Sequence, residues 1–446
     1  MRKHFIDQGF VALEASQLAH QKAMENISME EEIVMLDEAS QDQASVASDL
    51  AETDRILEVS DSLEDLAVIA DGIEEATPAE IALIENAGDM AVAGTDVSPE
   101  EVIPAMESYV GRRISTEGIK EKAKQIWESI IRFLKSIWEK IEGFVYKTVG
   151  TIPRLRKSIE ALEVKIEALG SAKAGKEIEI KSGVTSLSVA GEPIKSAAEL
   201  ATALGHTGAA AKFVFGPYLE SVVSRGEKTA TAIGDFDVTQ PEDSAKALVS
   251  ALNSVKMPSM PGLKATAKNH IVGFQTATGN HQLGNVHLLA KAYNDKDDGS
   301  VLAVLNRQRR SGIELTASDT PVKADATIKM APLTAAAMTS VLKTSKEILK
   351  TLEEFERGAR KTAVKKAQAD ISSAADKATK SMDSKAEGAN EAVAVAYYRA
   401  LVNFGPAYAR WVQSPALAQM STAMTAVRAT CMVVQKSLST YEAPAA

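Results

Sequence analysis

The 446-residue chain has one cysteine, Cys431, so it can form neither an internal disulfide nor a zinc site built from several cysteines. Aromatic residues make up only 5% of the chain, which favours thin helical packing over a deep enzyme-like cavity. No apolar run approaches the length of a membrane-spanning helix, and the N-terminus lacks the apolar core of a secretory signal. Together these absences weigh against a secreted, a membrane-spanning or a catalytic protein.

Motifs that carry chemistry are also missing. No phosphate-binding loop, dinucleotide-binding glycine motif, nucleophile elbow or zinc-protease motif occurs. His281 and His287 are the only histidines close in sequence, and their spacing does not place two ligands on one helix face. The run NDKDDG from Asn294 is similar to a calcium loop, but Lys296 and Leu305 occupy positions that need oxygen ligands. We therefore expect a hairpin turn there, ordinary histidines, no cofactor, no metal and no catalytic residue.

The net charge of −10 conceals two parts of opposite sign. Residues 1–117 contain 27 Asp and Glu against 6 Lys and Arg, a net charge of −21, which leaves +11 for residues 118–446. The acidic part has short amphipathic patterns such as SLEDLAVIADGIEEA, but like charges crowd it and aromatic mass is small. We expect a weakly ordered, helix-prone segment there. Such asymmetry is typical of an interaction tail or a removable segment.

The segment 118–146 has the strongest amphipathic pattern in the chain. After a break at Thr151 to Pro153 the helical spacing resumes, which predicts a helical hairpin over 118–170. Two interpretations of its apolar face stay open. It packs against the next helix, which we favour, or it lies at a membrane interface, because tryptophans flanked by lysines suit lipid headgroups. The face includes Trp127, Ile130, Phe133, Leu134 and Trp138.

The middle of the chain, 171–330, predicts a small α+β domain. KEIEI, SGIELTAS and ATIKM indicate short strands, and HLLAKAYNDKDDGSVLAVLN indicates two strands around a DDG turn. Helices are expected at 198–204 and 244–252. From Thr334 the helical spacing returns and runs to about residue 370, followed by a polar stretch that is either exposed helix or connector.

A last helical stretch is expected from about residue 391 to 439, with kinks or breaks at Pro406 and Pro415. The overall prediction is a mainly α fold with a small central α+β domain, an acidic and weakly ordered N-terminal propeptide, and long antiparallel helices. The expected divisions are the propeptide at 1–117, the amphipathic helical hairpin at 118–170, the α+β domain at 171–330 and a long helical hairpin at 331–446.

Two basic runs are candidate DNA contacts. Neither contains alternating aromatic residues, so a solvated face explains each run taken alone. The net charge of +11 favours weak, non-specific contact with double-stranded DNA, driven by counterion release. The candidate residues are Arg307, Arg309 and Arg310 in NRQRRSG, and Lys365 and Lys366.

The tripeptide Ser115-Thr116-Glu117, followed by Gly118, stands where the charge changes sign. Its pattern of small residue, any residue and glutamate resembles the maturation site of prohead proteases of phiKZ-like giant tailed phages. Other tripeptides match too, among them Ser158-Ile159-Glu160 and Ala190-Gly191-Glu192. Position therefore singles out Glu117, because a protease needs an extended, accessible segment and a short polar joint before a helix provides one.

The chain is similar to an internal head protein of that phage group. The similarity rests on the acidic propeptide, the cleavage joint, the helix IWESIIRFLKSIWEKI and the Ala/Met-rich C-terminal helices. The resemblance implies a non-enzymatic virion protein inside the phage head, packaged with the genome and cut by the phage prohead protease after Glu117. It implies capsid or inner-body proteins as partners and host cytoplasm as the location before assembly. Injection with the DNA and a host target stay open. A membrane-active effector or toxin with an acidic pro-region, and a capsid scaffold protein, are the alternatives.

Overall fold

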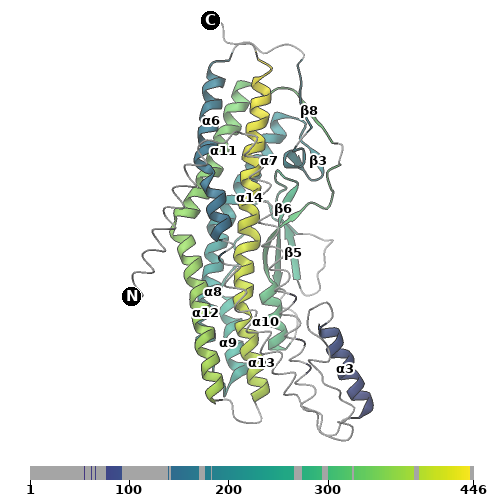
Figure 1. The fold of residues 1–446 in the computed structure, drawn as a ribbon, viewed down its shortest axis with the longest axis vertical. Coiled ribbons are helices and arrows are strands. Elements are labelled where there is room, and N and C mark those ends of the chain that lie inside the picture. The colour runs from purple at the N-terminus through teal and green to yellow at the C-terminus, as the bar shows by residue number, and fades with distance from the viewer. Residues whose placement is uncertain are drawn as a thin grey trace, which may run out of the picture.

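The computed structural model describes residues 77–92, 142–169, 176–181, 183–265, 274–293, 300–323, 326–385 and 391–441, together with the single residues 55, 62, 66 and 139. Most of them form a long helical bundle with small sheets on one flank (Figure 1). The predicted mainly α fold with a small α+β part and long antiparallel helices is confirmed.

The helices follow one another along the chain with bounds that account for most of the described residues. They are α3 (Pro78–Val92), α6 (Ile152–Glu167), α7 (Ala197–Phe213), α8 (Leu219–Gly234), α9 (Pro241–Asn253), α10 (Val301–Arg310), α11 (Ala335–Arg357), α12 (Ala359–Lys385), α13 (Glu391–Val402) and α14 (Phe404–Leu438). A π-helical turn, Val214–Tyr218, joins α7 to α8, and a 3-10 turn, Thr185–Leu187, precedes the second strand.

The strands are short and all pair antiparallel. The largest sheet has the order β4 (Lys264–Ala265), β5 (Phe274–Thr278), β6 (Val286–Tyr293) and β7 (Gly312–Ala317). Two smaller pairs join β1 (Ile178–Ile180) to β8 (Ile328–Met330) and β2 (Ser188–Val189) to β3 (Glu192–Pro193). The strands predicted from KEIEI, SGIELTAS and ATIKM are therefore confirmed as β1, β7 and β8.

The bundle is built around α14. In Figure 1, α14 runs along most of the bundle, and α11 and α12 run along it in the opposite direction. Apolar residues recur at three- and four-residue steps along α11, so one stripe faces the core. Its members are fully or nearly fully buried: Met338, Val341, Leu342, Ile348, Leu349 and Leu352.

The close approach of α8, α12 and α14 depends on a glycine. A Cβ atom placed on Gly226 would lie 2.5 Å from Cε2 of Tyr408 and 3.2 Å from Cβ of Ala367. The Tyr408 ring is itself fully buried, and its hydroxyl donates to the Val364 carbonyl at 3.0 Å. Only the absence of a side chain at position 226 lets the three helices meet here.

A kink or a break was expected at Pro415, and no break occurs there, because α14 continues through this proline. A proline has no N–H, so the carbonyl four residues earlier loses its helical partner. That carbonyl belongs to Trp411, and the Tyr218 hydroxyl donates a hydrogen bond to it at 2.9 Å. Tyr218 comes from the π-helical turn before α8. A side chain from another helix thus satisfies the group that the proline leaves unpaired.

The second strand predicted from DDGSVLAVLN is wrong, since these residues form α10. The Ser300 hydroxyl caps the helix by accepting from the Ala303 N–H at 3.3 Å. The apolar run from Val301 to Leu305 fits a strand equally well, and only Leu305 in it is fully buried. The expected turn itself, 294–299, lies outside the described residues.

The chain does not reverse at Thr151, where a hairpin was expected. Thr151 has helical backbone angles of φ −86° and ψ −14°, and Pro153 stands in the first turn of α6, where a proline fits. The described helical residues 142–150 therefore continue toward α6. Farther along, α7, α8 and α9 pack against α11, α12, α13 and α14, so helices on both sides of residue 330 share one core.

The acidic part contains one helix with described bounds, α3. Thr77 caps it reciprocally: its N–H donates to the Glu80 carboxylate at 2.8 Å, and the Glu80 N–H donates to the Thr77 hydroxyl at 3.3 Å. Ile81 and Ile84 are buried, whereas Leu83 on the other face is 66% exposed. The predicted helical tendency of this segment is confirmed at α3.

Candidate functional site

The cleavage joint, Ser115 to Gly118, lies outside the described residues, as does the apolar face with Trp127, Ile130, Phe133, Leu134 and Trp138. Their roles stay predictions. The structure does describe two competing tripeptides. Ser158-Ile159-Glu160 lies within α6, where Ile159 is fully buried. Ala190-Gly191-Glu192 forms the tight β2–β3 turn, with φ of +51° at Ala190 and +88° at Gly191. Neither presents the extended segment that a protease binds.

The arginines of NRQRRSG occupy the last turn of α10 and face different ways. Arg310 is exposed and Arg307 is half-buried, whereas Arg309 is only 7% exposed. The Arg309 carbonyl accepts a hydrogen bond from Nη2 of Arg410 on α14 at 2.7 Å. This contact satisfies one carbonyl at the end of the helix. Arg310 is consequently the most accessible of the three for a phosphate.

The two candidate lysines lie on α12, away from the α10 arginines. Both Lys365 and Lys366 are exposed, and Nζ of Lys365 pairs with a Glu142 carboxylate oxygen at 2.7 Å. α12 packs against α8, α11, α13 and α14, whereas α10 packs against α9, α13, α14 and β6. The two basic runs therefore belong to separate surfaces, and Lys366 is the more available cation on α12.

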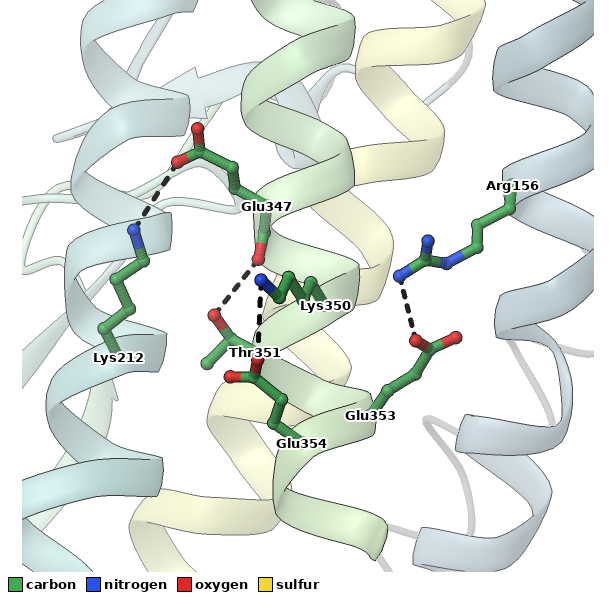
Figure 2. Close-up of polar contacts among 7 residues, drawn as sticks. All are labelled: Arg156, Lys212, Glu347, Lys350, Thr351, Glu353 and Glu354. Atoms are coloured by element: carbon green, nitrogen blue, oxygen red, sulfur yellow. Dashed lines mark hydrogen bonds and ion pairs between the residues drawn. The ribbon is translucent and has the colours of Figure 1, made fainter. Parts of the chain in front are cut away.

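Ion pairs join three helices across the bundle surface (Figure 2). Glu353 of α11 reaches Arg156 of α6 at 2.8 Å, while Glu347 of the same helix reaches Lys212 of α7 at 3.5 Å. The side chains are partly exposed, so each pair stabilises the fold by at most about 1 kcal/mol. Their main contribution is to the relative position of the helices, because they connect α11 to both α6 and α7.

A buried cation–aromatic cluster was missed from the sequence. Arg225 on α8 is 7% exposed, and its Cζ lies 4.2 Å from the centroid of the Trp411 ring on α14. Burial lowers the pKa of Arg225 to about 10, so the side chain stays charged at neutral pH. Burial also raises the pKa of the Tyr218 phenol that bonds the Trp411 carbonyl. A contact between residues so far apart in sequence leaves no spacing signal.

A histidine cluster was missed for the same reason. Nδ1 of His206 on α7 lies 3.1 Å from the His281 carbonyl oxygen, and Nδ1 of His281 lies 3.0 Å from the Ser318 hydroxyl. The rings of His281 and His287 have centroids 4.9 Å apart. In the part of the chain that the structure describes, no group of three or more His, Cys, Asp or Glu side chains could hold a metal ion.

One groove lies between α9 and α10, with a volume of about 310 Å³. Valines and small polar side chains line most of it, and Lys246 adds a charge. That lysine already pairs with Glu242 at 2.9 Å. The lining residues are Lys246, Val249, Ser250, Asn253, Val301 and Val304. Within the described ranges, no helix is long and apolar enough to cross a membrane.

Comparison with known protein families gives a match over most of the chain. The family model of phiKZ-like phage internal head proteins matches residues 29–435, which is about nine-tenths of the chain. The matched range includes most of the acidic part and nearly all of the basic part. No curated protein and no solved structure matches the chain.

Proposed function

The chain belongs to the family of phiKZ-like phage internal head proteins and is therefore a protein of the phage head; we propose that it is non-enzymatic, associates with the packaged genome and is matured by cleavage after Glu117. The observation that carries this proposal is the change of charge within the matched range, from −21 before the joint to +11 after it. The family match begins at residue 29, so most of the acidic leader lies in the matched range together with the basic body.

The two charges suggest how maturation controls DNA binding. A covalently joined acidic leader supplies a high local concentration of negative charge, which competes with DNA phosphates for the basic body. It also favours assembly with basic surfaces before the head is filled. Removal of the leader then uncovers the body as the genome enters. Contact with phosphates releases counterions, so the affinity falls steeply as salt rises.

The packing of the body supports a product that stays folded after the cut. The ion pairs that join α6, α7 and α11 all lie after residue 117, as do the helices that pack around α14. The leader also has buried apolar residues, because Leu66, Ile81 and Ile84 belong to the same hydrophobic core cluster as the apolar residues of the body. Cleavage and release of the leader are consequently separate steps, and each needs its own measurement.

Mass spectrometry of the protein from native phage particles tests the cleavage. We expect a semi-tryptic peptide that begins at Gly118 and no peptide from residues 1–117. Coverage of the leader in mature particles would overturn the maturation proposal. A new N-terminus at another small-x-Glu tripeptide would move the joint without removing the leader idea.

Duplex DNA binding by the full chain and by residues 118–446 tests the masking. We expect tight, salt-sensitive binding by the shorter chain and at least roughly tenfold weaker binding by the full chain at low salt. In the shorter chain, Arg310→Gln and Lys366→Gln each weaken binding and lower the salt slope by about one. Lys181→Gln, which changes an exposed lysine beside β1, is the matched control. Equal binding by both chains would contradict the masking.

An assembled particle distinguishes a DNA-associated protein from a scaffold. The proposal expects the protein to leave the shell together with the DNA when the particles are opened. Retention on emptied shells would favour a capsid-lining role instead.

A further inference from the structure

The histidine cluster sits where the four-stranded sheet meets the bundle. His281 lies in the β5–β6 connection and His287 on β6, while His206 reaches them from α7. The His281 carbonyl can only accept, so Nδ1 of His206 donates to it. Three imidazoles thus meet at one junction between elements that are distant in sequence.

The same connection carries the polar contacts that fix it to the bundle. The side-chain amides of Gln282 and of Gln419 on α14 donate to each other, at 3.2 and 2.8 Å, and both residues are fully buried. Gln419 also donates to the Thr207 carbonyl on α7 at 3.4 Å. Next to them, the Asn285 side chain accepts from the Gly191 N–H at 2.6 Å and donates to the Thr320 carbonyl at 3.0 Å.

A proton on Nδ1 of His287 would meet no acceptor in this junction. The residue is only 6% exposed, and its Nδ1 has no hydrogen-bond partner among the described residues. Protonation at Nδ1 would create a buried donor that nothing satisfies, together with a positive charge beside the His281 ring. The neutral form is therefore the one that fits the closed junction.

The net effect of the surroundings is to oppose protonation of His281 and His287. Burial is the largest influence and lowers the pKa of both His281 and His287. Lys264 and His206 lower the pKa of His281 further, and His281 does the same to His287. Among the described groups that act on the two rings, Asp319 is the one that raises their pKa.

We propose that His281 and His287, in the connection that His206 of α7 also contacts, form an acid-sensitive latch, which holds the β5–β6 connection on α7 and α14 near neutral pH and releases it when the imidazoles of His281 and His287 become protonated. The released parts are residues 279–285, strand β6 and the β2–β3 turn that Asn285 holds. The bundle helices keep their packing, because apolar contacts do not titrate.

The direction of the pH effect follows from linkage. Because the folded state lowers the pKa of His281 and His287, the opened state binds more protons as the pH falls below the ordinary histidine pKa of about 6.5. The stabilisation is complete above that pH and declines below it. Most carboxylates still carry their charge in the upper part of this window, so the histidine contribution can be measured separately.

Hydrogen exchange of the full chain, read by mass spectrometry at about pH 7.5 and about pH 5.5 and corrected for the intrinsic rate, tests the latch. We expect peptides from 279–293 to lose roughly tenfold in protection at the lower pH, while peptides from α11 and α14 keep theirs. The double variant His281→Gln with His287→Gln should lose this difference. His20→Gln, outside the cluster, should behave as the unaltered chain.

A second variant covers the case in which the double variant does not fold. His287→Phe keeps a ring in the buried position without a titrating group, and it should reduce the pH-dependent opening while the neutral-pH protection persists. An unchanged pH response in both variants would overturn the proposal. So would an equal loss of protection in the sheet and in the bundle helices.

Discussion

The helical bundle and the junction of the sheet are held together by different chemistry. In the bundle, α8, α12 and α14 meet over Gly226, where the contacts are apolar and leave no spare volume. At the junction, the contacts are the Gln282–Gln419 amide pair and the histidine cluster. Added volume therefore destabilises the bundle, and protonation destabilises the junction. The bundle should therefore tolerate acid, whereas the junction should loosen in acid.

The largest effect is expected from Gly226→Ala. The new Cβ would lie 2.5 Å from the fully buried Tyr408 ring, so the helices must separate, at a cost of about 3 kcal/mol in the free energy of unfolding. Gly205→Ala in α7 is the matched control, because nothing lies within 4 Å of its Cβ position. There, alanine should stabilise by about 0.5–1 kcal/mol. Denaturant unfolding that gives both variants the same sign would contradict this account of the bundle.

A middle-sized effect is expected from Tyr218→Phe. Loss of the hydroxyl leaves the Trp411 carbonyl buried without its partner, which costs about 1–3 kcal/mol. In a Pro415→Ala background, the introduced alanine supplies an N–H to the same carbonyl, so the cost of removing the hydroxyl should fall. A double-mutant cycle by denaturant unfolding measures the difference. If the two substitutions change the free energy of unfolding additively, Tyr218 does not compensate for Pro415.

The smallest effect is expected from Glu353→Gln. Its ion pair with Arg156 lies partly in solvent, with side-chain exposures of 19% and 35% for Glu353 and Arg156, so the loss should stay below about 1 kcal/mol. Thermal unfolding at low and high salt provides the measurement, and the difference from the unaltered chain should shrink as salt rises. A loss as large as that of Gly226→Ala would mean that charges, not packing, hold α6 to α11.

Helical spacing predicted the long helices because each buries one stripe on a shared core, as Met338, Leu342 and Leu349 do in α11. It failed for α10, where a short apolar run fits either period and a serine cap decides the outcome. It also left open a break at Pro415, whose missing hydrogen bond is repaired by Tyr218, far away in the sequence. Local sequence carries no trace of a partner that distant.

The candidate sites divide in the same way. Charge counting led to the predicted joint at Glu117, which lies outside the described residues, and to candidate cations that include Arg310 and Lys366, because charge is written directly in the sequence. The histidine cluster escaped, because it forms only when His206 meets a connection 75 residues later. Contacts of this kind come from the fold, and spacing rules within one element cannot find them.

The place of α14 in the chain has a consequence for biosynthesis. Every helix and strand that packs on α14 precedes it, from α6 through β7 to α12 and α13. These elements leave the ribosome with apolar residues that the later helix helps to cover. The bundle therefore stays incomplete until α14 is synthesised. Chains truncated before α14 would expose apolar surface and would be prone to aggregate.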